Sequence, residues 1–159
     1  MQNAPTINSS ESAPIKRDYT PGILPKRYYT VRAAALAAML KGEHLTGMDS
    51  VFKHSTTRLS PIICDALEKL YGWPVNHSDV LVGTNDGRIA PITTYWLSQE
   101  TIAQAFEGEA REWIVKVNAA RAEQRKQADK CKAEAAKRNA TRAQLRKHDP
   151  RQGDLWGGL

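Results

Sequence analysis

The clearest pattern along the chain is an apolar stripe between residues 59 and 70. Its members recur at intervals of three and four residues: Leu59, Ile62, Ile63, Ala66, Leu67 and Leu70. Residues at this spacing share one face of an α-helix, so the pattern predicts a helix with one buried side. Pro61 removes a hydrogen bond if the helix begins at Thr57, whereas it takes the favoured first position if Ser60 is the cap. We expect a distorted first turn.

Two shorter helices are predicted ahead of this stripe. The first lies between residues 30 and 42, where large apolar residues stand three and four positions apart among alanines. The second begins in the words "LTGMDSVF", where Thr46 caps the helix and Asp49 follows three residues later, in a variant of the capping box. Its buried side is expected to consist of Met48, Val51 and Phe52.

After Gly72 the apolar residues alternate with polar ones, which is typical of strands. We expect short strands at residues 73–76, 80–82 and 88–97. The last two are joined across "GTNDGR", where Asp-Gly supplies the positive φ angles of a tight hairpin. Pro91 cannot donate to a neighbouring strand, so the hairpin is expected at an exposed edge.

Helical spacing returns after Ser98 and then loses its apolar side. The apolar positions are Ile102, Ala105, Phe106, Trp113, Ile114 and Val117, and beyond about residue 119 alanine and charged residues dominate. We therefore predict a long, basic C-terminal helix over 98–147 that projects into solvent. Residues 1–29 are rich in Ser, Asn, Pro and Thr and are expected to form a disordered arm. Residues 148–159 are expected to form a flexible tail, which leaves 30–97 as the folded domain.

The net charge of +6 is unevenly distributed. Residues 30–97 carry six basic and six acidic side chains, whereas residues 98–147 carry twelve basic and seven acidic ones. The positive charge therefore lies in the arms of the chain, and a polyanionic partner is expected to meet it there.

Several classes of site are excluded by the residue types present. Cys64 and Cys131 have neither CxxC nor Cys/His spacing, so they predict no zinc site and no disulfide. The histidines share no ligand spacing and are expected to be solvated: His44, His54, His77 and His148. With no paired carboxylates, nucleophile motif or glycine-rich phosphate loop, we expect no enzyme and no cofactor. No long apolar run or signal peptide is present, so we expect a cytoplasmic protein without membrane contact.

The order of three helices followed by a β-hairpin is that of a winged helix-turn-helix. The words "LAAMLKGEHLTGMDSVFKHSTTRLSPIICDAL", "YGWPV" and "DGRIAPITTYWL" resemble a small winged helix domain that is common in bacteriophage and prophage proteins. The resemblance covers about residues 30–97. It implies a mainly α fold with a small β-hairpin, in which Thr-Arg-Leu opens the third helix and Gly-Arg lies in the wing.

A recognition helix presents its first residues to the major groove, where arginine can bind guanine in a bidentate pair. Thr56, Thr57 and Arg58 are the candidates for this role, although Thr56 is more readily explained as a helix cap, and Arg58 has Asp65 or Asp49 as alternative surface partners. Further contacts to the DNA backbone are predicted for the preceding turn, the wing and the basic helix: Lys53, His54, Arg88, Arg121, Arg125 and Lys126.

These features predict a phage-type protein that binds double-stranded DNA in the bacterial nucleoid, as a regulator or a replication accessory. The alternative is a non-enzymatic adaptor or host-takeover protein, because a neutral winged domain can also hold other proteins. The oligomeric state is left open, with a homodimer among the options.

The final words, "RQGDLWGGL", contain a second candidate site. Gln152, Asp154, Leu155 and Trp156 resemble the short peptide by which bacterial replication and repair proteins dock on the sliding clamp. Leu155 and Trp156 would fill an apolar pocket of the partner. The alternatives are that Trp156 folds back on the protein's own helices, or that the tail binds another host protein or none.

Overall fold

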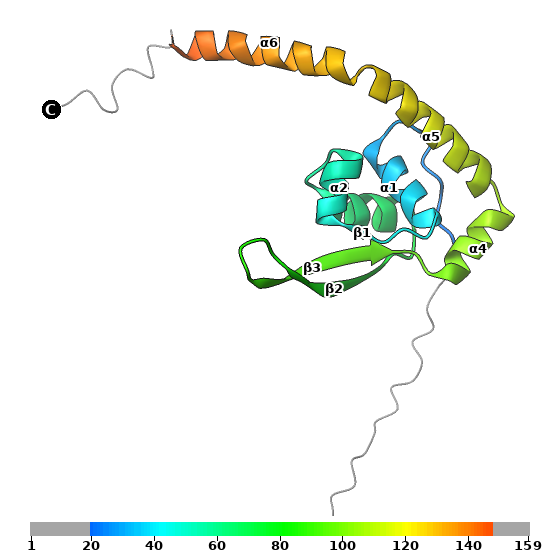
Figure 1. The fold of residues 1–159 in the computed structure, drawn as a ribbon. Helices are drawn as coiled ribbons and strands as arrows, with labels where there is room; N and C mark the ends of the chain where they lie inside the picture. The colour runs from blue at the N-terminus through cyan, green and yellow to red at the C-terminus, as the bar shows by residue number, and fades with distance from the viewer. Residues whose placement is uncertain (1–19, 148–159) are drawn as a thin grey trace, which may run out of the picture.

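A computed structural model describes residues 20–147 of the chain and shows a mainly helical protein with a small antiparallel sheet (Figure 1). The expectation of a mainly α fold with a small β-hairpin is confirmed. The helices are α1 (Val31–Leu40), α2 (Gly47–His54), α3 (Leu59–Pro61), the π-helix η1 (Ile62–Leu70), α4 (Gln99–Glu107), α5 (Ala110–Lys126) and α6 (Ala128–Lys147). The strands are β1 (Leu45–Thr46), β2 (Asn76–Gly83) and β3 (Ile89–Trp96).

The sheet has the order β1-β3-β2 and both pairings are antiparallel. The expected hairpin forms from β2 and β3, but of Asp86 and Gly87, which were both expected to have positive φ angles, only Gly87 has one, at 81°. The separate strand expected at residues 73–76 does not form, and only Asn76 belongs to a strand, as the first residue of β2. The two-residue strand β1, which the alternation of apolar residues did not predict, places Leu45 opposite Tyr95. Pro91 pairs with Leu81 beyond the end of β1, so β3 has one neighbour at that position. The hairpin is exposed, as expected.

The core is built around α1, which packs against α5, η1 and α2 (Figure 1). All its residues from 33 to 40 are buried. Small alanine side chains allow several elements to approach this helix closely, which explains why its sequence is alanine-rich on every side. Ile63, Leu67 and Trp73, from η1 and the segment after it, belong to the same buried cluster as this helix.

The buried side of α2 differs from the prediction. Met48, Val51 and Phe52 are 60%, 41% and 78% exposed, whereas Ser50 and His54 face the core. Ser50 and His54 lie four residues apart on one face of α2. This face contacts the turn between α2 and α3 and lies next to α5, and these neighbours decide which side of α2 is buried. The capping box between Thr46 and Asp49 is confirmed, since each residue bonds the other's backbone.

The third helix lies where the apolar stripe predicted it, but its winding changes after one turn. Arg58 occupies the cap position without a side-chain bond, so neither Thr57 nor Ser60 begins the helix as proposed. Pro61 falls inside the distorted first turn, and η1 follows with hydrogen bonds between residues five apart, as from Tyr71 N–H to the Ala66 carbonyl. The wider π turn breaks the stacking of residues three and four apart, and Leu70 is exposed.

Residues 20–29 pack against the domain, in contrast to the expected free arm. The indole N–H of Trp73 donates to the carbonyl of Ile23 at 2.9 Å, and the indole N–H of Trp113 donates to the carbonyl of Pro25 at 2.9 Å. Pro25 is buried between these contacts. Buried indole N–H groups need an acceptor, and this segment provides it. Residues 1–19 of the predicted arm lie outside the described residues.

The predicted single helix over residues 98–147 is divided into three. The chain breaks at Gly108 and Glu109 between α4 and α5, and again at Gln127 between α5 and α6. The first break lets α4 and α5 both turn their apolar sides to the core, where Ile102, Trp113 and Val117 are buried. The described side chains of α6 are almost all exposed, and Figure 1 shows this helix extending beyond the rest of the fold, which agrees with the predicted solvated helix.

Candidate nucleic-acid interface

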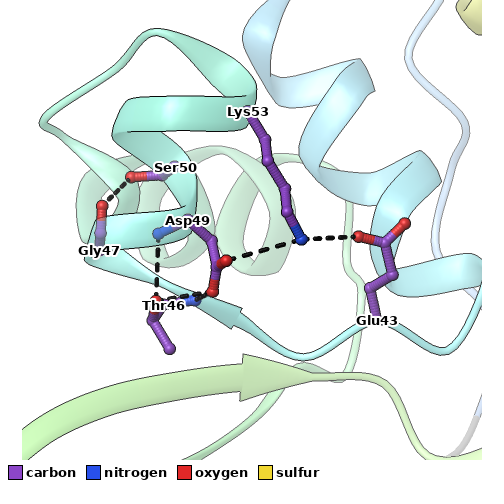
Figure 2. A network of polar contacts seen from close by, with 6 residues as sticks. All are labelled: Glu43, Thr46, Gly47, Asp49, Ser50 and Lys53. Atoms are coloured by element: carbon purple, nitrogen blue, oxygen red, sulfur yellow. Dashed lines mark hydrogen bonds and ion pairs between the residues drawn. The ribbon is translucent and has the colours of Figure 1, made fainter.

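The turn between α2 and α3 is fixed by Ser50, a residue that the sequence patterns did not single out. Its buried hydroxyl lies 2.7 Å from the Gly47 carbonyl oxygen, as Figure 2 shows, and 3.0 Å from the Thr56 carbonyl oxygen. The Ser50 carbonyl accepts from the N–H groups of Ser55 and Thr56. Ser55 has a φ of 55°, in the left-handed region, where the chain reverses. The turn therefore holds the residues before the third helix in one conformation.

Replacing Ser50 by alanine is expected to destabilise the fold by about 1 to 3 kcal/mol, because the part-buried Thr56 carbonyl, 3.0 Å from the Ser50 hydroxyl, loses a side-chain donor. Urea unfolding of the full chain measures this change. Ser60→Ala is the matched control, since Ser60 is exposed in the next helix. Equal stability of the two variants would contradict the role of Ser50.

Thr57 and Arg58 are exposed at the start of the third helix. Within residues 20–147 the Arg58 guanidinium makes no ion pair: Asp65 pairs with Lys69 at 2.8 Å, and Asp49 contacts Lys53 at 3.5 Å. The alternative surface partners of Arg58 are therefore occupied by other residues. Thr56 acts locally instead, because its hydroxyl accepts from the Arg58 N–H at 3.2 Å, so Thr56 holds the turn and is not the helix cap.

Lys53 is held between two carboxylates. Its ammonium lies 3.5 Å from Asp49 and 3.5 Å from Glu43, as Figure 2 shows. Asp49, followed by Glu43, raises the pKa of Lys53 above its ordinary value. A hydrogen bond from Thr46 lowers the pKa of Asp49, so the carboxylate stays ionised beside the lysine. A DNA phosphate would have to compete with these two partners for Lys53.

Arg88 lies at the hairpin tip, where the sequence placed it, and its side chain is 77% exposed. Its guanidinium is paired with Asp86 at 2.6 Å. A hydrogen bond from Thr84 and then the bond from Arg88 lower the pKa of Asp86. The positive charge of Arg88 is thus compensated within the turn itself.

His54 is buried, with 8% of its surface exposed, which corrects the expectation of a solvated side chain. His54 is buried because it lies one helical turn after Ser50, on the same face of α2, and this face is turned toward the core. Burial, and next the charge of Arg121, lower the pKa of His54 below its ordinary value. The imidazole is therefore neutral at pH 7.

Four of the predicted DNA-binding residues meet around one pocket of about 350 Å³ between α1, α2 and α5. These are Lys53, His54, Arg121 and Arg125, and the pocket is also lined by Lys41 and Glu43. Lys41 was missed because nothing in its neighbours marks it as part of a site; it caps the end of α1. Lys126, also predicted, pairs with Glu123 at 2.8 Å and does not line this pocket.

The remaining candidates do not assemble into a reactive site. His44 stacks on Trp96 with ring centroids 5.1 Å apart, and both cysteines are free. Among residues 20–147, no group of three or more metal-ligating side chains comes together, and no helix is long and apolar enough to cross a membrane. The predicted docking residues lie outside the described part of the chain: Gln152, Asp154, Leu155 and Trp156.

Comparison with protein-family models, with curated proteins and with solved structures finds no match to this chain. The case for a function therefore comes from the positions of its own residues.

Proposed function

We propose that the protein binds double-stranded DNA through a winged helix-turn-helix over residues 30–97. The order helix, short strand, helix, helix, hairpin supports this proposal, as does a sheet in which β1 lies beside β3. In such a domain the third helix enters the major groove with its first residues, and the hairpin lies beside the DNA backbone. Thr57 and Arg58 occupy the first of these positions and Arg88 the second.

The single observation that carries the proposal is the state of Arg58. It is exposed and free of ion pairs within the described residues, at the start of a helix whose approach is fixed by Ser50. An arginine held in this way can donate two hydrogen bonds to O6 and N7 of a guanine without first breaking an ion pair. Because the turn is already formed in the free protein, binding to DNA does not have to order this segment and loses no conformational entropy there.

The basic helices provide the second part of the proposed interface. The winged unit is neutral, and three of its cations are already paired with carboxylates: Lys53, Lys69 and Arg88. Nonspecific affinity for DNA comes mainly from neutralised phosphates, so α5 and α6 must supply most of it. The protein would then act in the bacterial nucleoid as a phage or prophage regulator or replication accessory.

Removing residues 127–159 is expected to weaken binding to all DNA sequences alike and to flatten the dependence of affinity on salt. Each lost phosphate contact removes about 0.9 from the slope of log affinity against log salt. Fluorescence anisotropy from 50 to 300 mM salt, with selected and random duplexes, measures both effects. The melting temperature should stay nearly unchanged, since among the described residues α6 is exposed and has appreciable contacts with α5 alone. An unaltered slope would assign α6 to spacing.

A selection of binding sites from random duplexes by the full-length protein tests the proposed function directly. The expected result is an enriched sequence that binds at physiological salt and contains a guanine whose replacement weakens binding. Recovery of no preferred sequence, with binding lost near 150 mM salt, would contradict sequence-specific DNA binding.

A non-enzymatic adaptor is the second candidate, and the exposed apolar side of α2 favours it. Met48, Val51 and Phe52 form a continuous apolar set at helical spacing, and such sets are typical of protein–protein contacts.

The sliding clamp is the partner suggested by the sequence of the tail. A synthetic peptide of residues 148–159 should bind purified clamp, and changing Leu155 and Trp156 together to alanine should abolish this. Failure of the full-length protein to bind clamp at tens of micromolar would exclude that partner.

A further inference from the structure

The pocket between α1, α2 and α5 has an excess of positive charge. Four cationic side chains line it, and Glu43 is the only carboxylate among its lining residues. They come from three parts of the chain: Lys41 directly follows α1, Lys53 belongs to α2, and Arg121 and Arg125 lie one turn apart on α5. Glu43 is itself bound to Lys53 at 3.5 Å. The charges of Lys41, Arg121 and Arg125 therefore remain without a carboxylate within residues 20–147.

Two side chains in this pocket would gain from a bound ligand: within residues 20–147, His54 lacks a partner at one nitrogen, and Arg121 donates to the neutral Gln124 side chain at 3.3 Å but pairs with no carboxylate. His54 is more than nine-tenths buried, and within the described residues its Nε2 has no hydrogen-bond partner. Buried polar atoms are nearly always bonded, so an orphaned nitrogen beside a pocket indicates a missing partner. Arg121 is half-buried, and burial followed by the nearby charge of Arg125 lowers its pKa. Both groups would gain from an anion.

We propose that this pocket binds a phosphate group. Guanidinium groups bind phosphate oxygens with two parallel hydrogen bonds, and Arg121 and Arg125 are spaced by one helical turn, so they can share one group. The volume of about 350 Å³ falls at the lower end of the range for small-molecule sites, enough for a phosphate and the group attached to it. The lysines at its rim, Lys41 and Lys53, act as further point charges.

The phosphate has two sources with the same chemistry. One is the backbone of bound DNA: His54 precedes Arg58 by four residues, which limits their separation to about 14 Å, so one duplex can reach both. The other is a free phosphorylated molecule. With DNA as the source, the inference rests on the proposed function; with a free phosphate it stands alone.

The test uses the full-length protein and follows the His54 imidazole by NMR, with His54→Asn identifying its signal. Pyrophosphate, inorganic phosphate and a selected DNA duplex are the probes. We expect pyrophosphate to shift the His54 signal in a saturable manner and to raise the pH at which it titrates, because an anion stabilises the protonated ring. Arg121→Gln is expected to weaken pyrophosphate binding about tenfold or more.

Arg125→Gln serves as a second variant, because Arg125 is exposed and its replacement should leave the fold intact. Arg111→Gln is the matched control, since Arg111 lies on the same helix, outside the pocket, over the Phe106 ring. Pyrophosphate binding that this control leaves unchanged, and that both pocket variants weaken, supports the site.

The arms with DNA identify the source. A His54 shift by DNA, with displacement of pyrophosphate, assigns the pocket to the DNA backbone. Pyrophosphate binding that DNA does not affect assigns it to a free phosphorylated molecule, and this result holds even if DNA fails to bind and the proposed function is wrong. The inference is overturned if no probe moves the His54 signal, or if both pocket variants bind as the original protein does.

Discussion

Replacing Arg58 by alanine is expected to weaken binding to a selected DNA site by about 1 to 3 kcal/mol, which corresponds to roughly 5- to 150-fold in affinity. The expectation follows from the exposed, unpaired guanidinium at the start of the third helix. Binding to random duplexes should change much less, because Arg58 makes no specific base contact there and contributes only its positive charge. Fluorescence anisotropy with both duplexes, at fixed salt, measures the difference.

Two further variants show whether a loss of affinity comes from a lost base contact or from a lost positive charge. Arg58→Lys keeps the charge but not the planar pair of donors, so it should lose most of the preference for the selected site while retaining nonspecific affinity. Arg32→Ala, at the start of α1 and also exposed, should leave the preference intact. Equal losses on selected and random duplexes after Arg58→Ala would remove its reading role. A melting temperature close to that of the original protein would exclude unfolding as the cause.

Replacing Leu67 by aspartate is expected to unfold the domain. Leu67 is fully buried in η1 and packs into the cluster around α1 and Trp73. A carboxylate at this position loses its hydration without gaining a partner, at a cost of several kcal/mol, which approaches the whole stability of a typical domain of about 5 to 15 kcal/mol. Circular dichroism and thermal unfolding measure the result.

Leu70→Asp is the matched control on the same helix. Leu70 completes the apolar stripe of the sequence, yet 61% of its surface is exposed, so this substitution should change stability by less than about 1 kcal/mol. Comparing Leu67→Asp with Leu70→Asp therefore tests whether η1 has the wider π-helical turn, which leaves Leu70 exposed. Comparable unfolding by both substitutions would mean that Leu70 is buried, as in a regular α-helix.

Local patterns in the sequence were enough to predict features that depend on neighbouring residues. The capping box of Thr46 and Asp49 and the hairpin turn at Gly87 both formed where the sequence placed them. Each depends on backbone groups within a few positions, and residue type and spacing describe such contacts directly. The buried stripe from Leu59 to Leu67 belongs to the same group, since helical spacing alone selects its face.

The orientation of α2 shows where local patterns stop. Hydrophobicity favoured Met48, Val51 and Phe52 as the buried side, but Ser50 and His54 take that place. Ser50 is buried because its hydroxyl bonds a carbonyl beyond the turn, and His54 because α5 approaches from a distant part of the chain. Which face is covered depends on the neighbours, and the helix's own sequence does not contain them.

Contacts between distant segments were decided only by the tertiary structure. The docking of residues 20–29 depends on bonds from Trp73 and Trp113, which are 50 and 88 positions from their acceptors. The pocket between α1, α2 and α5 likewise joins Lys41, His54 and Arg121 from separate parts of the chain. The sequence by itself determined the approximate places of the first three helices and of the hairpin, and the basic, helical character of the C-terminal part. The assembly of the candidate sites required the packing of those elements, because charge and spacing do not encode which helix faces meet.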